Sequence, residues 1–285
     1  MRSLQDRRVA ARGTEWRKRG YESSAHEVID GQRIRFARTR RGARRKARAM
    51  SIVARFNEPV ICREHAALDR ALSGGCPHIV LAGGGRFSLS LLANAVYPLI
   101  EVRDAVRLSL SLADAATVRL VVAARASVNL GLSDEARAEI DVRDAAALKV
   151  FAAQMSDLTI RAHGESKVRM CLTGESRGYC YCLDDSRSAM KVVDESQATV
   201  RGWGRARVGL TAQDEASAYV NVGGNTEVTI TARTKDRTRE SVRVECHGLA
   251  LINVRHGEQR VSIAGQPARR PQGIAYRNER EALER

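Results

Sequence analysis

The chain repeats itself every ten residues, without insertion or deletion, across residues 101–232. Positions whose number ends in 4 are mostly Asp or Gly, and after the first repeat those ending in 6 are Ala, Ser or Thr. Positions ending in 0 are apolar in every repeat, and those ending in 8 and 2 are mostly apolar or small. The apolar set therefore recurs at every second residue, which is the periodicity of a β-strand.

The Asp or Gly at each position ending in 4 predicts a corner, because Asp can bond nearby backbone amides and Gly tolerates a left-handed conformation. One strand plus one corner, repeated thirteen times, is typical of a solenoid whose coils stack and bury a continuous thin core. An Ala-rich helical array is the alternative, but strict alternation leaves no helical face. We therefore predict a mainly β protein with a parallel β-solenoid (β-helix).

Charge pairing indicates how many repeats form one turn. With two repeats per turn, residues twenty apart lie about 4.8 Å from each other, so Arg137, Asp157 and Arg177 form a column of alternating charge. With three repeats per turn, Arg107, Arg137 and Lys167 would form a column of like charge, which is unfavourable. We therefore predict two repeats per turn and a flattened solenoid of two sheets.

The composition divides the chain into four segments. Residues 1–50 contain 16 Lys and Arg against 5 Asp and Glu, whereas residues 101–257 contain 22 against 21. The first segment is also poor in large apolar residues, so it is expected to be a flexible basic arm, with a short helix over 40–50. We predict an α/β cap at 51–86, the solenoid at 87–265 and an exposed tail at 266–285.

The basic arm has two interpretations. It can dock onto nucleic acid or another polyanion, or it can be a solubilising tail or an over-extended gene start. Its densest cationic part contains Arg38, Arg40, Arg41, Arg44, Arg45, Lys46 and Arg48.

The cap is predicted from short elements between the arm and the repeats. Residues 63–72 read as a helix that Gly74 and Gly75 terminate, and strands are expected at 52–54, 60–61 and 78–82. The three glycines at 83–85 lack the Lys-Ser/Thr of a phosphate-binding loop, which favours a tight turn. A cap is expected because an open solenoid end exposes unpaired backbone.

No composition feature indicates a cofactor, a metal or a membrane span. The six cysteines have neither metal-ligand spacing nor a disulfide pattern, and no apolar run or secretory signal is present. We therefore expect a cytoplasmic protein. Calcium on the corner carboxylates is disfavoured because the Gly-Gly-x-Gly-x-Asp repeat of calcium-binding rolls is absent.

The sequence does not indicate an enzyme. In the predicted stacking, Glu139 lies beside Arg119 and Asp141 beside Arg161, which favours salt ladders over catalytic carboxylates. The histidines near turns have no Ser or Cys nucleophile at a spacing that would form a catalytic group. They are His163, His247 and His256.

The two predicted sheets present different outward side chains. One sheet is a candidate anion-binding or nucleic-acid-binding face, with Glu227 as its single acid. Its cations are Arg107, Lys149, Lys167, Arg169, Arg187, Lys191 and Arg207. The other sheet is a candidate protein-binding face because it carries Tyr179, Tyr181 and Tyr219. An ordinary solvated surface remains the alternative for both.

The motif Asp/Gly-x-Ala/Ser-x-Val-x-Val, as in residues 114–120 and 204–210, resembles short tandem-repeat β-solenoid proteins of actinobacteria and their phages. The usual period in that group is eight, not ten. The resemblance implies a structural or interaction role in a phage or mobile-element setting, including the virion.

We therefore predict a non-enzymatic scaffold that presents a rigid face to a protein partner or to a second copy of the chain. The alternative is a nucleic-acid-binding protein that uses the basic arm and the Lys/Arg-rich face.

Overall fold

The computed structural model describes residues 26–29, 32–35, 58–91, 96–233 and 241–265. It separates into two units, residues 1–55 and 56–285. In the first unit, β1 (His26–Ile29) pairs antiparallel with β2 (Gln32–Arg35), a hairpin that the sequence did not lead us to expect in the basic arm. The helix expected over 40–50 and the strand at 52–54 lie outside the described residues.

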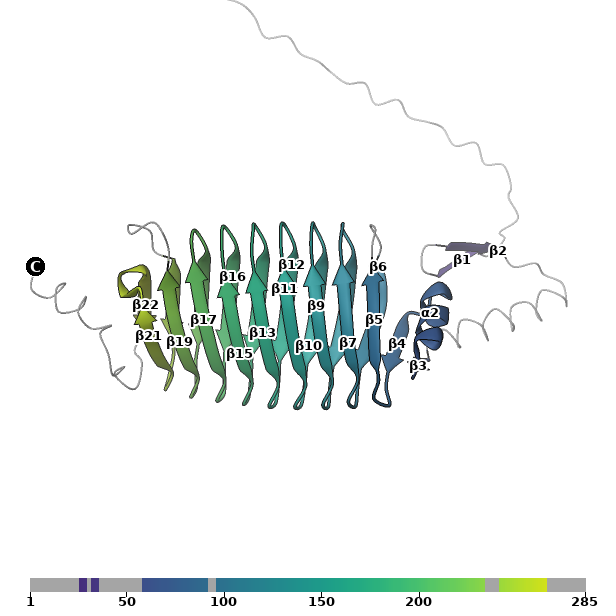
Figure 1. The fold of residues 1–285 in the computed structure, drawn as a ribbon, viewed down its shortest axis with the longest axis horizontal. Helices are drawn as coiled ribbons and strands as arrows, with labels where there is room; N and C mark the ends of the chain where they lie inside the picture. The colour runs from purple at the N-terminus through teal and green to yellow at the C-terminus, as the bar shows by residue number, and fades with distance from the viewer. Residues whose placement is uncertain (1–25, 30–31, 36–57, 92–95, 234–240, 266–285) are drawn as a thin grey trace, which may run out of the picture. The chain divides into compact units, whose positions relative to one another are not determined.

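The second unit is a parallel β-solenoid made of two facing sheets (Figure 1). Sheet I has 11 strands in the order β22-β20-β18-β16-β14-β12-β10-β8-β6-β4-β3. Sheet II has 9 strands in the order β21-β19-β17-β15-β13-β11-β9-β7-β5. Successive strands of the chain alternate between the two sheets from β4 to β22, so each full turn contains one strand of each sheet.

The strands of sheet I are β3 (Val60–Cys62), β4 (His78–Leu81), β6 (Val96–Val102), β8 (Thr117–Val122), β10 (Arg137–Val142), β12 (Asp157–Ala162), β14 (Arg177–Cys182), β16 (Gln197–Gly202), β18 (Ser217–Val222), β20 (Val242–Cys246) and β22 (Val261–Gly265). Those of sheet II are β5 (Arg86–Leu91), β7 (Arg107–Leu112), β9 (Ser127–Leu132), β11 (Ala147–Ala152), β13 (Lys167–Leu172), β15 (Arg187–Val192), β17 (Arg207–Gln213), β19 (Glu227–Arg233) and β21 (Leu251–His256).

The register confirms two repeats per turn. In β10, β12 and β14, Arg137 pairs with Asp157 and Asp157 pairs with Arg177, each twenty residues further along the chain. Side chains at positions ending in 6, 8, 0 and 2 point inward and are buried throughout the repeats, apart from glycines, which have no side chain. Irregular strands extend both sheets beyond the thirteen repeats, so the 11 strands of sheet I span about 48 Å rather than the roughly 30 Å of six or seven coils.

Every corner of the repeats contains one residue with a positive φ. These residues are the thirteen positions ending in 4, and nine of them are not glycine. At many corners the residue's side chain accepts a hydrogen bond from the backbone N–H at the equivalent position of the preceding coil. Asp144 Oδ2 accepts from Ala124 N at 2.9 Å, and Asp184 Oδ2 accepts from Gly164 N at 3.1 Å. The corner carboxylates thus satisfy backbone donors between coils.

The helix α2 (His65–Ser73) closes the N-terminal end of the solenoid and confirms the helix predicted at 63–72. Its Leu68 and Ala71 are buried in the core, and Gly74 forms its C-cap. The His65 imidazole accepts a hydrogen bond from Ser88 N on the edge strand β5 at 3.3 Å. Gly83 N, in the predicted glycine turn, donates to Asp104 Oδ2 at 2.8 Å.

At the opposite end, β21 and β22 are the last strands of their sheets, and no described residue pairs with their outer edges. Between them lies the short 3-10 helix η1 (Glu258–Arg260). Val261 and Ile263 of β22 are only partly buried against the core. Residues 234–240 and the tail expected at 266–285 lie outside the described residues.

Ala124 provides a test of the corner conformation because it has a φ of 58° without a polar side chain. A left-handed conformation costs a residue with a Cβ about 1 kcal/mol, whereas Gly adopts it freely. We expect Ala124→Gly to raise the free energy of unfolding by about 0.5 kcal/mol, since part of the gain is offset by the greater entropy of the unfolded chain. Urea denaturation followed by circular dichroism measures this change.

The control is Ala123→Gly, one residue earlier, where φ is not positive. This variant should lower the free energy of unfolding by about 0.5–1 kcal/mol. Equal destabilisation by both substitutions would contradict the proposed role of φ.

Candidate interaction surfaces

The described residues contain no group of three or more His, Cys, Asp or Glu side chains placed to hold a metal ion. His163 Nε2 lies 3.6 Å from Asp141, and His78 Nε2 lies 3.4 Å from Glu101, so both histidines face carboxylates rather than nucleophiles.

The buried cysteines also lack the environment of a nucleophile. Cys180 and Cys182 lie inside the solenoid with their sulfur atoms 3.6 Å apart. The hydrogen bond with Cys182 and burial raise the pKa of the Cys180 thiol, and burial raises the pKa of Cys246 to about 11. The hydrogen bond with Cys180 lowers the pKa of the Cys182 thiol instead. The raised pKa values keep Cys180 and Cys246 protonated at neutral pH, and all three side chains are buried as small core residues.

The outer face of sheet II carries the seven predicted cations and is called the basic face below. All seven side chains are exposed: Arg107, Lys149, Lys167, Arg169, Arg187, Lys191 and Arg207. Arg86 of β5 pairs in register with Arg107 and extends the face, although it lies before the first repeat. Within the part of the chain that the structure describes, the only ion pair of these seven cations joins Arg207 Nε to Glu227 Oε2 at 3.5 Å.

A column of like charge lies on the basic face. Lys167 pairs in register with Arg187, and Arg187 pairs with Arg207. Glu227 follows Arg207 in the next strand and ends the column. Three neighbouring cations at the strand spacing repel one another, because like charges directly opposite are destabilising.

The outer face of sheet I differs because its carboxylates are paired with Arg side chains. Glu139 lies 3.4 Å from Arg119 Nε and accepts a hydrogen bond from Arg161 Nη1 at 2.6 Å. Arg137 Nε lies 3.8 Å from Asp157 Oδ2, as the two-repeat stacking predicts.

The register confirms that Asp141 lies beside Arg161, but each of the two side chains forms its ion pair with another residue. Arg161 reaches diagonally to Glu139. Asp141 forms its ion pair with Arg143, two residues along the chain. The register determines which backbone residues are adjacent. A long Arg side chain, however, can reach several carboxylates and pair with any one of them.

The three tyrosines predicted to bind a protein all point outward from sheet I, although their surroundings differ. Tyr219 donates a hydrogen bond to Glu245 Oε2 at 2.5 Å and is half-buried. The Arg201 guanidinium lies 5.8 Å from the centre of the Tyr181 ring, as in a cation–π contact. Tyr179 is the most exposed of the three, at 43%.

Trp203 belongs with these residues, and the sequence analysis missed it. It lies in the corner that follows β16, one coil after Tyr181, and is 43% exposed. Its indole lies over Gly223 of the next coil, where an added Cβ would come within 3.4 Å of the Trp203 Nε1 atom. The sequence could have indicated Trp203, because it is one of only five aromatic residues in the repeats. Tyr179, Tyr181, Arg201 and Trp203 are called the aromatic cluster below.

The corners that lead from sheet II back to sheet I form a third surface, called the acidic corner. Its six corners, residues 113–116, 133–136, 153–156, 173–176, 193–196 and 213–216, contain no Lys or Arg. Its acids are Asp114, Asp134, Glu135, Glu175, Asp194, Glu195, Asp214 and Glu215. The four glutamates are exposed and form no ion pair with any residue that the structure describes.

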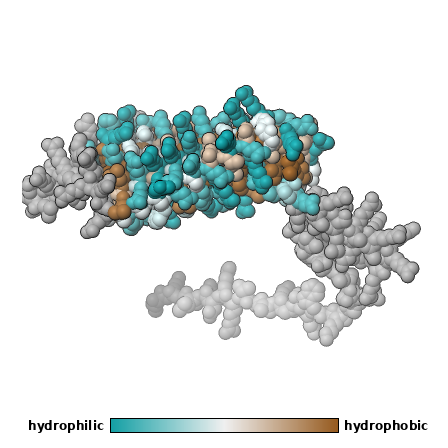
Figure 2. All heavy atoms as spheres, turned by 90° about the horizontal axis from the view of Figure 1, so that it is seen from below, coloured by the Kyte–Doolittle hydropathy of each residue, from teal (hydrophilic) through white to brown (hydrophobic). Residues whose placement is uncertain are grey.

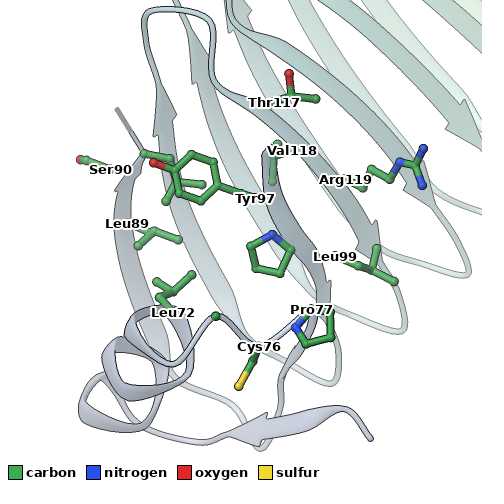
Figure 3. Close-up of a pocket in the computed structure, with 13 residues that line it drawn as sticks. Leu72, Cys76, Pro77, Leu89, Ser90, Tyr97, Leu99, Thr117, Val118 and Arg119 are labelled. Carbon is green, nitrogen blue, oxygen red and sulfur yellow. The ribbon is translucent and has the colours of Figure 1, made fainter. Parts of the chain in front are cut away.

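The face of the solenoid shown in Figure 2 is largely hydrophilic along its middle, and hydrophobic residues gather near its two ends. At the N-terminal end a pocket of about 920 Å³ lies between α2 and the first coils (Figure 3). Leu72, Leu89, Tyr97 and Leu99 provide much of its apolar lining, and Arg119 lies at one side. Residues 92–95, which join β5 to β6 in the chain, lie outside the described residues, so we assign the pocket no role.

The arm cations predicted to bind nucleic acid also lie outside the described residues: Arg38, Arg40, Arg41, Arg44, Arg45, Lys46 and Arg48. None of the helices in the described part of the chain is long and apolar enough to cross a membrane. Comparisons with protein-family models, with curated proteins and with solved structures found no match to this chain.

Arg187 tests whether the cation column is a strained arrangement. It lies between Lys167 and Arg207 and has no ion pair with a described residue. We expect Arg187→Gln to leave the free energy of unfolding unchanged or to raise it by a few tenths of a kcal/mol, because the substitution removes repulsion between exposed charges. Urea denaturation at low ionic strength measures the effect.

The matched control is Arg161→Gln on sheet I, which removes the hydrogen bond to Glu139. It should lower the free energy of unfolding by up to about 1 kcal/mol. A larger loss from Arg187→Gln than from Arg161→Gln would show that the column stabilises the fold.

Proposed function

We propose that this protein is a non-enzymatic scaffold that binds a protein partner through the aromatic cluster. The observation that carries the proposal is the clustering of Tyr179, Tyr181, Arg201 and Trp203 on two adjacent coils, at the border of sheet I and the corner that follows it. Trp, Tyr and Arg are the residues most enriched among those that dominate binding energy at protein interfaces.

Aromatic residues are scarce elsewhere in the repeats, which supports this choice of surface. Of the five aromatic residues between 101 and 232, four lie between 179 and 219, and Phe151 is the fifth. If aromatic residues were placed at random, they would be spread along the whole solenoid. The narrow core takes small side chains, so the aromatic residues of the repeats point outward. There they do not disturb the packing of the core and can contact a partner.

The scaffold keeps these side chains in place. Tyr179 and Tyr181 extend from β14, which is paired on both sides by β12 and β16. Tyr and Trp have only two side-chain torsions, so a partner that covers them loses little conformational entropy on binding. A rigid strand with rigid rings is a preorganised binding surface.

The proposal predicts that a partner is lost when the cluster is removed. The chain carrying Tyr179→Ala and Trp203→Ala should retain its circular dichroism spectrum, since both side chains are 43% exposed. In affinity purification from nuclease-treated lysate of the native source, a protein enriched by the unmodified chain should fall at least about tenfold with this variant, as expected for residues that dominate an interface. Quantitative mass spectrometry measures the ratio.

The matched control replaces Phe151 and Met155 with Ala. These residues are 52% and 56% exposed and lie on or beside sheet II, away from the cluster. The control should keep the partner. Equal loss with both variants, or no protein that depends on Tyr179 and Trp203, would reject the aromatic cluster as the binding surface.

Nucleic-acid binding is the second candidate function, and the unpaired cations of the basic face favour it. The basic arm adds a formal charge of +11 from its 16 Lys and Arg against 5 Asp and Glu. The described face carries a single exposed aromatic residue, Phe151, and borders the acidic corner, so the arm should dominate any affinity for phosphates. A phage or mobile-element setting belongs to the scaffold proposal, and its support is the repeat motif alone.

Arm and face can be separated by deletion and substitution. Removing residues 1–48 should abolish most salt-sensitive retention on heparin or DNA and leave the solenoid folded. The chain with Lys167→Gln, Arg187→Gln and Arg207→Gln should keep most of this salt-sensitive retention. Retention lost with the second variant but kept by the first would make the basic face the nucleic-acid site. Elution salt concentration on a heparin column is the measurement.

A further inference from the structure

Two columns of opposite charge have the same spacing because the same coils set both. On the basic face, Lys167, Arg187 and Arg207 follow one another at intervals of twenty residues. On the acidic corner, Glu175, Glu195 and Glu215 follow at the same interval. One turn of the solenoid separates successive members in each column, so both have an axial spacing of about 4.8 Å.

Within a single molecule, the like charges of each column repel one another. The three glutamates are exposed and have no ion pair with any described residue. Of the three cations, only Arg207 has an ion pair with a described residue, Glu227. The two columns lie at different positions around the coil, because the cations begin the strands of sheet II and the glutamates follow those strands in the next corner.

We propose that two copies of this chain associate side by side, with the basic face of one copy against the acidic corner of the other. The equal spacing lets Lys167, Arg187 and Arg207 of one copy meet three glutamates of the second copy, charge for charge. The partner of the basic face is thus a second copy of the chain. This interaction is independent of the aromatic cluster.

The distribution of charge favours a second copy over a nucleic acid as the occupant of this face. The basic face borders the acidic corner, whose six corners carry eight acids and no Lys or Arg. A long polyanion that lies across the strands would be repelled as it reaches that corner. A second copy carries both signs at the spacing required, so electrostatic complementarity selects it and fixes its axial register.

The association should depend on salt, because exposed charges are screened over about 10 Å at 0.1 M ionic strength and over about 3 Å at 1 M. The full chain, treated with nuclease, is examined by sedimentation velocity over a range of concentrations. We expect a dimer or higher assembly at about 50 mM salt whose apparent Kd rises at least about tenfold at 0.5 M salt. A monomer at every concentration and low salt would overturn the proposal.

Charge reversal tests the two surfaces directly. The first variant carries Lys167→Glu, Arg187→Glu and Arg207→Glu, and the second carries Glu175→Lys, Glu195→Lys and Glu215→Lys. Each variant alone has two surfaces of the same sign and should sediment as a monomer. An equimolar mixture should associate again, because the reversed face of the first variant meets the reversed corner of the second.

The mixture separates this proposal from loss of folding and from other interfaces. Restored association requires that both variants are folded, which circular dichroism confirms independently. Two folded variants that fail to associate when mixed would overturn the proposal, as would variants that associate alone as strongly as the unmodified chain. Self-association of the unmodified chain that disappears on nuclease treatment would make nucleic acid the occupant and overturn it too.

A charge-matched control replaces Arg103, Arg125 and Arg143 with Glu. These residues lie in the corners that lead from sheet I to sheet II, on the opposite edge from the acidic corner. The control changes the formal charge by the same amount as the first variant and should retain self-association within about twofold, because screening limits the range of exposed charges. Loss of association in this control would show that net charge, rather than the two columns, is responsible.

Discussion

The pairing of each strand with the strand twenty residues later is the constraint on which the whole solenoid depends. Parallel pairing fixes the distance between coils, so every side chain lies beside its equivalent in the coils before and after it. Inward positions are then filled mostly by small or medium apolar residues, with Ser or Thr at several positions ending in 6. Outward positions form columns whose members attract or repel one another. Core, corners and surface charge are therefore all periodic for the same reason.

The repeat alone predicts the fold because its two signals agree. Alternation indicates strands, and Asp or Gly at every tenth residue indicates corners, so local preference and global arrangement point to the same coil. Charge pairing of Arg137 with Asp157 then decides between two and three repeats per turn, and the register confirms it. The helix after Glu64 is also predictable, from its apolar side and the glycines that follow it.

Features that depend on contacts between coils are harder to predict. Asp184 was expected to bond backbone near itself, but its carboxylate reaches the amide of Gly164 in the preceding coil. Arg161 chooses Glu139 over Asp141 because its side chain is long enough to reach either. Trp203 was missed because a corner position ending in 3 has no fixed character in the repeat. The β1–β2 hairpin lies in a segment whose composition gave no strand period.

The alternation of strands between two sheets also constrains how this sequence can change in length. Insertion or loss of a single ten-residue unit preserves every strand and corner, but it moves all later strands to the opposite sheet. The cations after that point would then lie on the side of the tyrosines, and the continuous columns would be broken. A change of twenty residues leaves both faces intact and lengthens or shortens the molecule by one coil. Duplications that preserve function should therefore come in even numbers of repeats.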